Sequence, residues 1–282
     1  MCNKLLNRGK KSILPSHDCG KELADKFVNY FNEKISLIRE NLEKSPIDTP
    51  EHLSDISPEF HGTPLDTFQT VSQDDVRKII HASPTKSCAL DPIPTWLLKQ
   101  CEEQIIPVLT LIVNVSLETA EFSDELKKAF VTPLIKKALL DCEILKNYKP
   151  VSNLSFVSKL LERIVCVQLV DHLKVNGLYE VFQSAYRQLH STETALLRVH
   201  NDLLQAVDSH GGAILVLLDL SAAFDTIDHA KLLNILNTSF GIHGSALNWF
   251  SSYLKDRTQT VQIGSSVSKS NLIHCLDSNI VS

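Results

Sequence analysis

The sequence lacks the cysteine pattern of a disulfide-stabilised or zinc-binding module. Its seven cysteines are scattered, odd in number and without a Cys-x-x-Cys pair, which excludes a disulfide framework and suits a reducing compartment. A run of about 18 apolar residues is also missing, and the charged stretch 1–12 has no apolar centre of the kind that a secretory signal needs. We therefore expect no transmembrane helix, no signal peptide, no membrane partner and a cytoplasmic or nuclear location.

The charge of the chain gives no global signal for nucleic acid, because the net charge of the 282 residues is −5. The charge is nevertheless uneven. Residues 126–190 contain ten bases and five acids, a local net charge of +5, which leaves −10 for the remainder. A basic surface on an acidic chain can face a polyanion, although an ordinary solvated face would give the same count.

Apolar residues at helical spacing predict most of the secondary structure. Ser72 with Asp75 is typical of a helix start, Gly177 of a helix end, and Asp228 of a helix cap. The expected helices cover residues 21–44, 71–83, 95 onward, 105–121, 156–176, 191–209, 229–240 and 246–256.

Three segments are predicted to form strands. Residues 129–137 form one, and residues 258–275 alternate around Gly264-Ser265 in the manner of a β-hairpin. The third, AILVLLDL over residues 213–220, is an almost continuous apolar run after Gly211-Gly212. Such a run favours a strand that is buried on both faces.

Asp219 is the one carboxylate of that apolar run. At the C-terminal end of a buried strand it would lie where α/β sheets place their sites, and it would need a cation, a metal or a hydrogen-bond donor. A bond to a neighbouring backbone N–H is the alternative reading. The small residues 221–223 leave room for a ligand and Phe224 follows them, whereas Asp225 and Asp228 are expected to be turn and cap residues.

The stretch LVLLDLSAAFDTIDH, residues 215–229, resembles the first catalytic motif of reverse transcriptases from non-LTR (LINE-type) retrotransposons. Further segments are similar to the same family in the same order. They are KSCALDPIPTWLLKQC upstream of the fingers, NYKPVSNLSFVSKLLERIVCVQLVDHL and FQSAYRQLHSTETALLRVHNDLL in the fingers, and ALNWFSSYLKDRTQTVQIGSSVS in the palm. Together they cover about residues 70–275.

The resemblance implies an α+β fold: a partial right-hand polymerase, with fingers and the first half of the palm, preceded by a helical N-terminal region. Three parts are expected. Residues 1–68 are a helical N-terminal segment and a proline-containing linker, residues 69–125 are a helical segment upstream of the fingers, and residues 126–282 are the partial reverse transcriptase domain.

The resemblance also implies the site. Asp219 would be catalytic and, with the backbone carbonyl of Leu220, would bind Mg²⁺ or Mn²⁺; enzymes of this kind use two such ions in phosphoryl transfer to a primer 3′-OH. The implied partners are an RNA template, a DNA primer and deoxynucleoside triphosphates. Lys159 and Arg163 would contact nucleic-acid backbone, or be ordinary surface cations. The implied nucleotide-binding residues are Lys149, Arg187, Ser221, Ala222, Ala223 and Phe224, the last of which would exclude a ribose 2′-OH.

Two departures from the family are visible. Gln188-Leu189 follow Arg187, where the family has Pro-Gly, and no Tyr-Ala-Asp-Asp turn occurs in the sequence. We therefore expect a domain that is truncated before that turn, without an upstream endonuclease, catalytically inactive, and able to self-associate through an uncovered sheet edge. The alternative function is a non-catalytic nucleic-acid-binding remnant of a decayed element.

Overall fold

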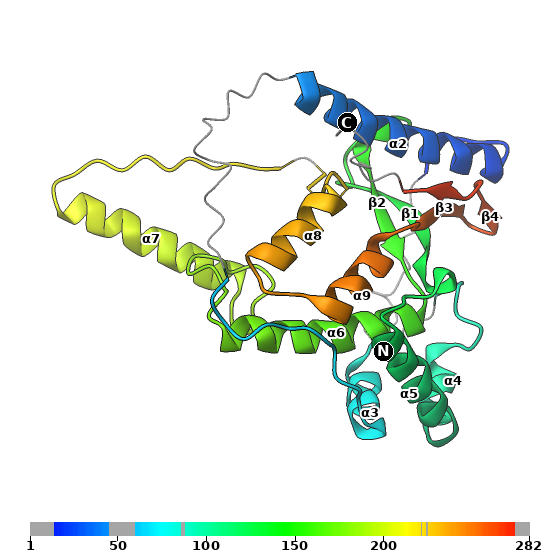
Figure 1. Ribbon diagram of the computed structural model, residues 1–282. Helices are drawn as coiled ribbons and strands as arrows, with labels where there is room; N and C mark the ends of the chain where they lie inside the picture. Colours follow the sequence, from blue (N-terminus) through cyan, green and yellow to red (C-terminus); the bar gives the residue numbers. More distant parts are fainter. Residues whose placement is uncertain (1–13, 45–59, 86–87, 221, 224, 274–282) are drawn as a thin grey trace, which may run out of the picture.

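The computed structural model joins one mixed sheet to helices that pack on it and beside it (Figure 1). Because helices and strands both contribute to its cores, the fold is of a mixed α/β kind. The structure describes residues 14–44, 60–85, 88–220, 222–223 and 225–273.

Each helix predicted from the sequence is present. The helices are α2 (Gly20–Lys44), α3 (Gln73–Ala82), α4 (Thr95–Gln100), α5 (Glu102–Thr119), α6 (Phe156–Val175), α7 (Thr192–Asp208), α8 (His229–Thr238) and α9 (Gly244–Leu254), with the short 3₁₀ turns η2 (Asp124–Lys127) and η3 (Leu145–Asn147). The strands are β1 (Lys128–Ile135), β2 (Tyr148–Asn153), β3 (Thr258–Ile263), β4 (Ser266–Val267) and β5 (Asn271–Leu272).

The predicted helix ends are confirmed where a local side chain or glycine defines them. Ser72 and Asp75 form a reciprocal capping box at the start of α3. The Asp228 carboxylate accepts a hydrogen bond from the backbone N–H of Lys231, at 3.0 Å, and so caps α8. Gly177 follows α6 with a φ of +65°, a conformation that glycine adopts without steric cost.

The sheet has the strand order β2-β1-β3-β4, and β5 also pairs with β3. β1 is antiparallel to β2 and parallel to β3. The predicted hairpin around Gly264 is confirmed by the antiparallel pair of β3 and β4. Strand β2 was not predicted from the sequence, because its segment is polar and contains Pro150. It forms because six consecutive residues pair with β1.

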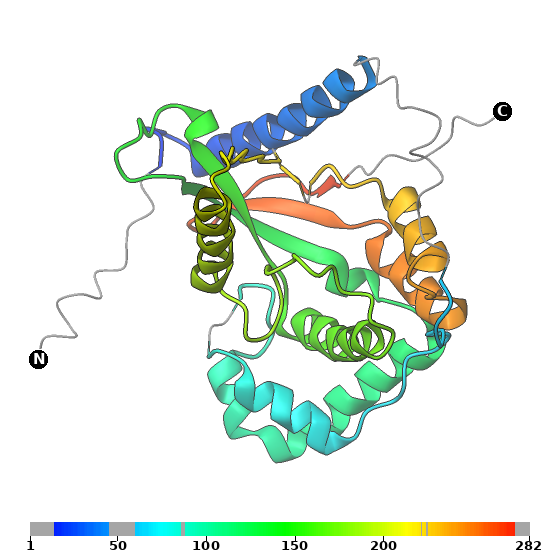
Figure 2. The same ribbon diagram turned by 90° about the vertical axis from the view of Figure 1, so that its left-hand side faces the viewer.

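Helix α2 covers one face of this sheet (Figure 2). Phe27 and Phe31 lie in a core with Val131 of β1 and Val261 of β3, and all four are at most 5% exposed. The ring of Tyr148, from β2, meets the ring of Phe27 edge-on at 5.0 Å. The N-terminal helix is therefore part of the packing that holds the central sheet.

The second core lies among α3, α5, α6 and α9. Trp249 of α9 is at its centre and is 1% exposed. Its ring packs edge-on against Phe68 and Phe122 and stacks on Tyr253 at 5.4 Å. Its indole N–H donates to the Ser116 hydroxyl of α5 at 3.1 Å. The contacts with Phe68, Phe122 and Ser116 join segments that are more than a hundred residues apart in the sequence.

The predicted buried strand over residues 213–220 is wrong. Residues 211–220 form neither helix nor strand, and Ile214 and Leu218 are 93% and 91% exposed. A strand needs a neighbour for its backbone N–H and C=O groups, and none of the described strands pairs with this segment. The segment runs back toward the sheet from α7, which projects from the rest of the molecule (Figure 1) and has no buried residue.

Candidate nucleic-acid and nucleotide site

Asp219 lies in the exposed, unpaired segment rather than at the end of a buried strand. The neighbouring Leu220 is 79% exposed. No backbone hydrogen bond between described residues holds residues 212–220 in place. Asp219 is therefore displayed on an extended chain, and the rigid setting that its predicted role requires is not formed by the described residues.

The residues after Asp219 form a turn. Ser221 and Phe224, both predicted to bind nucleotide, lie outside the described residues. Ala222 has a φ of +53°, and its carbonyl accepts hydrogen bonds from the backbone N–H groups of Asp225, at 2.9 Å, and Thr226, at 3.2 Å. Ala223 is half-buried in the same turn. The predicted turn role of Asp225 is confirmed.

Helix α2 holds this turn against the sheet. The guanidinium of Arg39 donates to the backbone carbonyl of Asp225 at 3.3 Å. Burial raises the pKa of the Asp225 carboxyl above its usual value, and the nearby ammonium of Lys34 partly offsets that rise. Ala222 and Asp225 line a small cavity with Lys34 and with Tyr148 of β2. The turn is therefore ordered by the N-terminal helix, although the segment before it is not packed.

Lys149 lies on the face of the sheet that α2 leaves uncovered. Side chains alternate along a strand, and Tyr148, the residue before it, is buried against α2. The exposed residues of this second face include Thr132 and Leu134 of β1 and Lys149 and Val151 of β2. An exposed lysine on an open sheet face can reach a phosphate.

Lys159 and Arg163 lie together in one cleft, as their spacing of one helical turn on α6 predicts. The Lys159 ammonium donates to the Asn153 side chain at the end of β2, and the Arg163 guanidinium donates to the Ser83 hydroxyl at 2.6 Å. The cleft has a volume of about 390 Å³. It is lined by Ser83, Pro84, Asp91, Asn153, Phe156, Lys159, Leu160 and Arg163.

Asp91 organises this cleft and was not singled out from the sequence. Its two carboxylate oxygens accept hydrogen bonds from the backbone N–H groups of Cys88, at 2.8 Å, and Phe156, at 2.5 Å. The loop before α4 is thereby fixed to the first turn of α6. The Asp-Pro turn is a visible signal in the sequence, but its partner Phe156 is 65 residues away and no local pattern identifies it.

Arg187 does not share this cleft. Its guanidinium donates to the backbone carbonyls of Glu180 and Gln183, at 3.1 and 3.2 Å, and lies 4.9 Å from the ring centre of Tyr179. Arg187 thus holds its own loop together. Leu189, two residues later, has a φ of +65°, a left-handed conformation that costs a non-glycine residue about 1–2 kcal/mol.

The described residues do not fit a divalent metal pair. Among them, no three side chains of His, Cys, Asp or Glu lie close enough to hold a metal ion. The two predicted ligands, Asp219 and the Leu220 carbonyl, lie on an exposed chain, whereas Mg²⁺ requires octahedral oxygen coordination. Among the residues that the structure describes, no helix is both long enough and apolar enough to cross a bilayer.

Residues 134–273 match the family described as reverse transcriptase (RNA-dependent DNA polymerase). The chain is 27% identical over 271 residues to the probable RNA-directed DNA polymerase from transposon BS of Drosophila melanogaster, across 95% of this chain and 30% of that relative. It is 29% identical over 191 residues to the probable RNA-directed DNA polymerase from transposon X-element of the same species, across 67% of this chain and 21% of that relative.

A further relative is the RNA-directed DNA polymerase from the mobile element jockey of Drosophila melanogaster, 27% identical over 208 residues, across 71% of this chain and 23% of that relative. The chain thus spans less than a third of each of these relatives. The matches define a reverse transcriptase domain. Together with the sequence motifs, these similarities support a reverse transcriptase domain of a non-LTR, LINE-type element.

Proposed function

We propose that this chain is the template-binding part of an RNA-directed DNA polymerase, comprising the fingers and the first half of the palm. Its nucleic-acid partners are an RNA template and the DNA primer paired to it. This assignment takes residues 126–282 as the partial polymerase domain and residues 1–68 and 69–125 as its two preceding segments. A cytoplasmic or nuclear location accords with a template of RNA.

The observation that carries the proposal is that basic side chains follow one another along the chain from β2 into α6. Lys149 is exposed on the open sheet face, and Asn153, at the end of the same strand, accepts from Lys159. Arg163 follows Lys159 by one turn on the wall of the same cleft. Three cations along one strand and one helix suit a polyanionic backbone, because phosphate contacts dominate nucleic-acid affinity.

Deoxynucleotide binding is the second part of the proposal. Ser221 and the small residues Ala222 and Ala223, which follow Asp219, would lie along a triphosphate, and Phe224 would exclude a ribose 2′-OH. Arg187 is the further candidate from the fingers. We propose that this site becomes effective only when the segment 213–220 is paired, because only then is Asp219 fixed relative to the turn.

Accordingly, we propose that the 282-residue chain alone does not extend a primer. Metal-assisted phosphoryl transfer needs several ligands acting as a unit, and the described residues gather no group of three His, Cys, Asp or Glu side chains that could hold a metal ion. The alternative, a binding module without catalysis, is favoured by the same observation. Incubation of the chain with a primed RNA template, deoxynucleotides and Mg²⁺ or Mn²⁺ tests this, and extension that Asp219→Asn abolishes would contradict it.

The test of template binding is an anisotropy titration of a labelled RNA–DNA primer–template at several salt concentrations. Lys149→Ala combined with Arg163→Ala should weaken binding and lower the salt slope by about 2, since each lost phosphate contact removes about 0.9. Lys44→Ala, an exposed cation at the end of α2, is the matched control. Equal affinity and slope for the double variant and the control would contradict the proposal.

The exposed apolar segment also leads us to propose that the chain self-associates at high concentration. Sedimentation equilibrium should reveal a concentration-dependent mass. Leu217→Lys, in the centre of the segment, should abolish the dependence, and a monomer at all concentrations would contradict the idea.

A further inference from the structure

Helix α5 is apolar on two faces. One face is buried in the helical core and includes Ile106, Leu109 and Val113. The other face is a stripe formed by Val108, Leu111, Ile112 and Val115, which are 56%, 64%, 39% and 47% exposed. These four residues have the i, i+3, i+4, i+7 spacing of a helix-packing surface. A helix that is apolar on both faces normally has neighbours on both.

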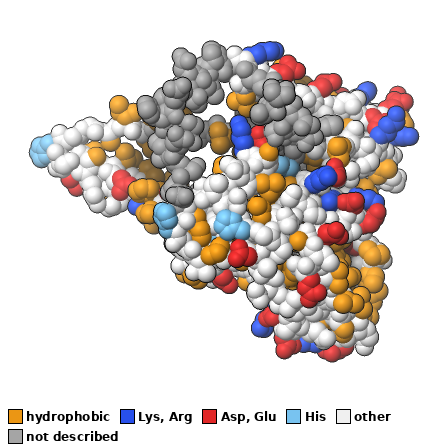
Figure 3. Space-filling view, viewed as in Figure 1, with side chains coloured by type: hydrophobic (Ala, Val, Ile, Leu, Met, Phe, Trp, Pro, Cys, Tyr) orange, Lys and Arg blue, Asp and Glu red, His pale blue; other side chains and the backbone are white. Residues whose placement is uncertain are grey.

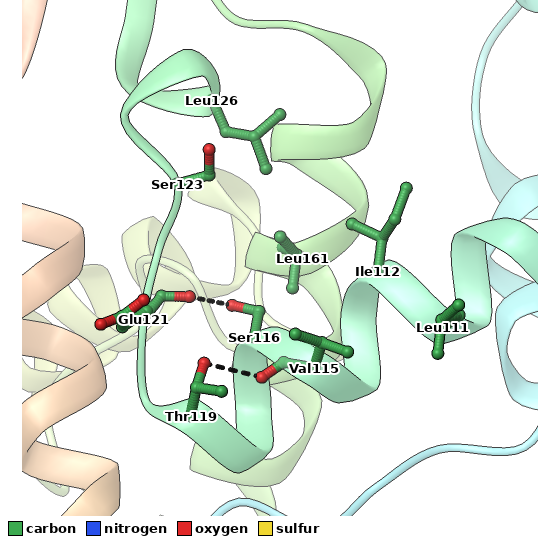
Figure 4. Close-up of a pocket in the computed structure, with 9 residues that line it drawn as sticks. All are labelled: Leu111, Ile112, Val115, Ser116, Thr119, Glu121, Ser123, Leu126 and Leu161. Atoms are coloured by element: carbon green, nitrogen blue, oxygen red, sulfur yellow. Dashed lines mark hydrogen bonds between the residues drawn. The ribbon is translucent and has the colours of Figure 1, made fainter.

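Leu111, Ile112 and Val115 of the stripe form one wall of a groove (Figure 4). The groove has a volume of about 380 Å³, and its opposite side is made by Leu126, after α5, and Leu161 of α6. A hydrogen bond between two lining residues fixes its shape, because the Ser116 hydroxyl donates to the backbone carbonyl of Glu121 at 2.5 Å. In the space-filling view, hydrophobic side chains gather over the region of α4 and α5 (Figure 3).

The rim of the groove is acidic. Helix α5 contains Glu102, Glu103 and Glu118 and no lysine or arginine, and Glu121 lies in the groove itself. Glu102 and Glu103 pair with side chains of α3. Among the described residues, Glu118 and Glu121 take part in no ion pair. The groove therefore combines an apolar lining with Glu121 in its wall and Glu118 near the end of the same helix, two carboxylates outside the described ion pairs.

We propose that this groove binds a basic amphipathic helix of a partner protein. The apolar side chains of that helix, at i, i+3, i+4 and i+7, would pack on the α5 stripe, and its lysines or arginines would face Glu118 and Glu121. A second copy of this chain is a poorer occupant. Its exposed amphipathic helix, α7, contains Glu193, Asp202 and Asp208 against a single arginine, so the acidic rim repels it.

The proposal is tested with two synthetic helices of about 18 residues, or five turns. Both carry leucine at the stripe spacing; the remaining positions are lysine in one peptide and glutamate in the other. The lysine peptide should bind at least about tenfold more tightly in fluorescence anisotropy, and should protect α5 in hydrogen exchange. The combined change Leu111→Ser and Val115→Ser should weaken its binding about tenfold or more, as loss of buried leucine and valine contacts predicts.

The matched control combines Leu139→Ser with Val175→Ser, since both residues are more exposed than the stripe, at 101% and 81%, and lie outside the groove. It should leave binding unchanged. The combined change Glu118→Lys and Glu121→Lys should reverse the preference in favour of the glutamate peptide. The proposal is overturned if neither peptide binds, if the stripe and control variants behave alike, or if the rim variant keeps the original preference.

Discussion

Strand β3 and the segment 213–220 are of similar length, but β3 is a paired strand and the segment is unpaired and exposed. β3 lies between β1 on one side and the short strands β4 and β5 on the other, beneath α2. Its residues Val261 and Ile263 are 1% and 6% exposed, although four of its six residues are threonine or glutamine. Residues 213–220 are almost entirely aliphatic, yet Leu217 is 84% exposed.

The comparison teaches that a pairing partner, rather than apolar content, decides whether a stretch becomes a buried strand. β3 finds partners within the described residues and 213–220 finds none. The functional consequence falls on Asp219, which belongs to the unpaired stretch. Lys149, Lys159 and Arg163 belong to the packed part, so the proposed template-binding surface is formed while the proposed catalytic site is not.

The largest expected difference between the two regions is in stability. Phe27→Ala, which leaves a cavity in the core between α2 and the sheet, should lower the free energy of unfolding by about 3–5 kcal/mol. Leu217→Ala should change it by less than about 0.5 kcal/mol, because the side chain is already exposed. Urea denaturation measures both. A loss above about 1 kcal/mol for Leu217→Ala would mean that the segment is packed after all.

The same contrast separates two aspartates. Asp91→Ala leaves the backbone N–H groups of Cys88 and Phe156 without their acceptor, and should cost about 1–3 kcal/mol. Asp219→Asn should leave the free energy of unfolding unchanged, because no described contact depends on its charge. Chemical denaturation of the two variants measures both free energies of unfolding. A larger loss of stability for Asp219→Asn than for Asp91→Ala would contradict the comparison.

Leu189 offers a smaller effect in the loop of Arg187. Leu189→Gly relieves a left-handed backbone conformation and should stabilise the protein by up to about 1 kcal/mol, after the entropic cost of glycine. Gln188→Gly, at the neighbouring position without a positive φ, should bring no gain. Thermal unfolding of both variants is the measurement, and a destabilised Leu189→Gly would contradict the strain.

The smallest effect concerns pH and the turn held by α2. Because the folded-state pKa of Asp225 is raised, the neutral carboxyl favours the fold below the unfolded pKa near 3.9, and this contribution is lost as the pH rises through the folded pKa. Asp225→Asn should therefore match the natural chain at pH 4 and be more stable at pH 7 by less than about 1 kcal/mol. A variant that is less stable at pH 7 in urea titrations would contradict the assignment.

The elements that depend on nearby residues were predictable from the sequence. Ser72, Gly177 and Asp228 define helix ends through contacts within a few residues, and all three predictions are confirmed. The two errors concern strands. β2 is polar and contains Pro150 but pairs with β1, whereas 213–220 is apolar but unpaired, and pairing depends on distant residues.

The candidate site likewise contains residues that local sequence patterns predict and residues that they do not. The spacing of Lys159 and Arg163 predicted one shared surface, because four residues make one helical turn. Their neighbours Ser83 and Asp91 come from a loop more than sixty residues earlier, and no local pattern links that loop to α6. The family motifs identified the domain, but motif order gives no geometry for Asp219, and the roles of the site residues stay predictions.

The most direct test of the account is hydrogen–deuterium exchange of the 282-residue chain, followed by peptide mass analysis. If Asp219 lies on an unpaired segment, the amides of residues 213–220 should exchange at close to the rate of an unstructured peptide, while those of β3 should be protected by the global stability of the fold. Protection of 213–220 comparable to that of β3 would mean that the segment is a paired strand and that the Asp219 site is assembled.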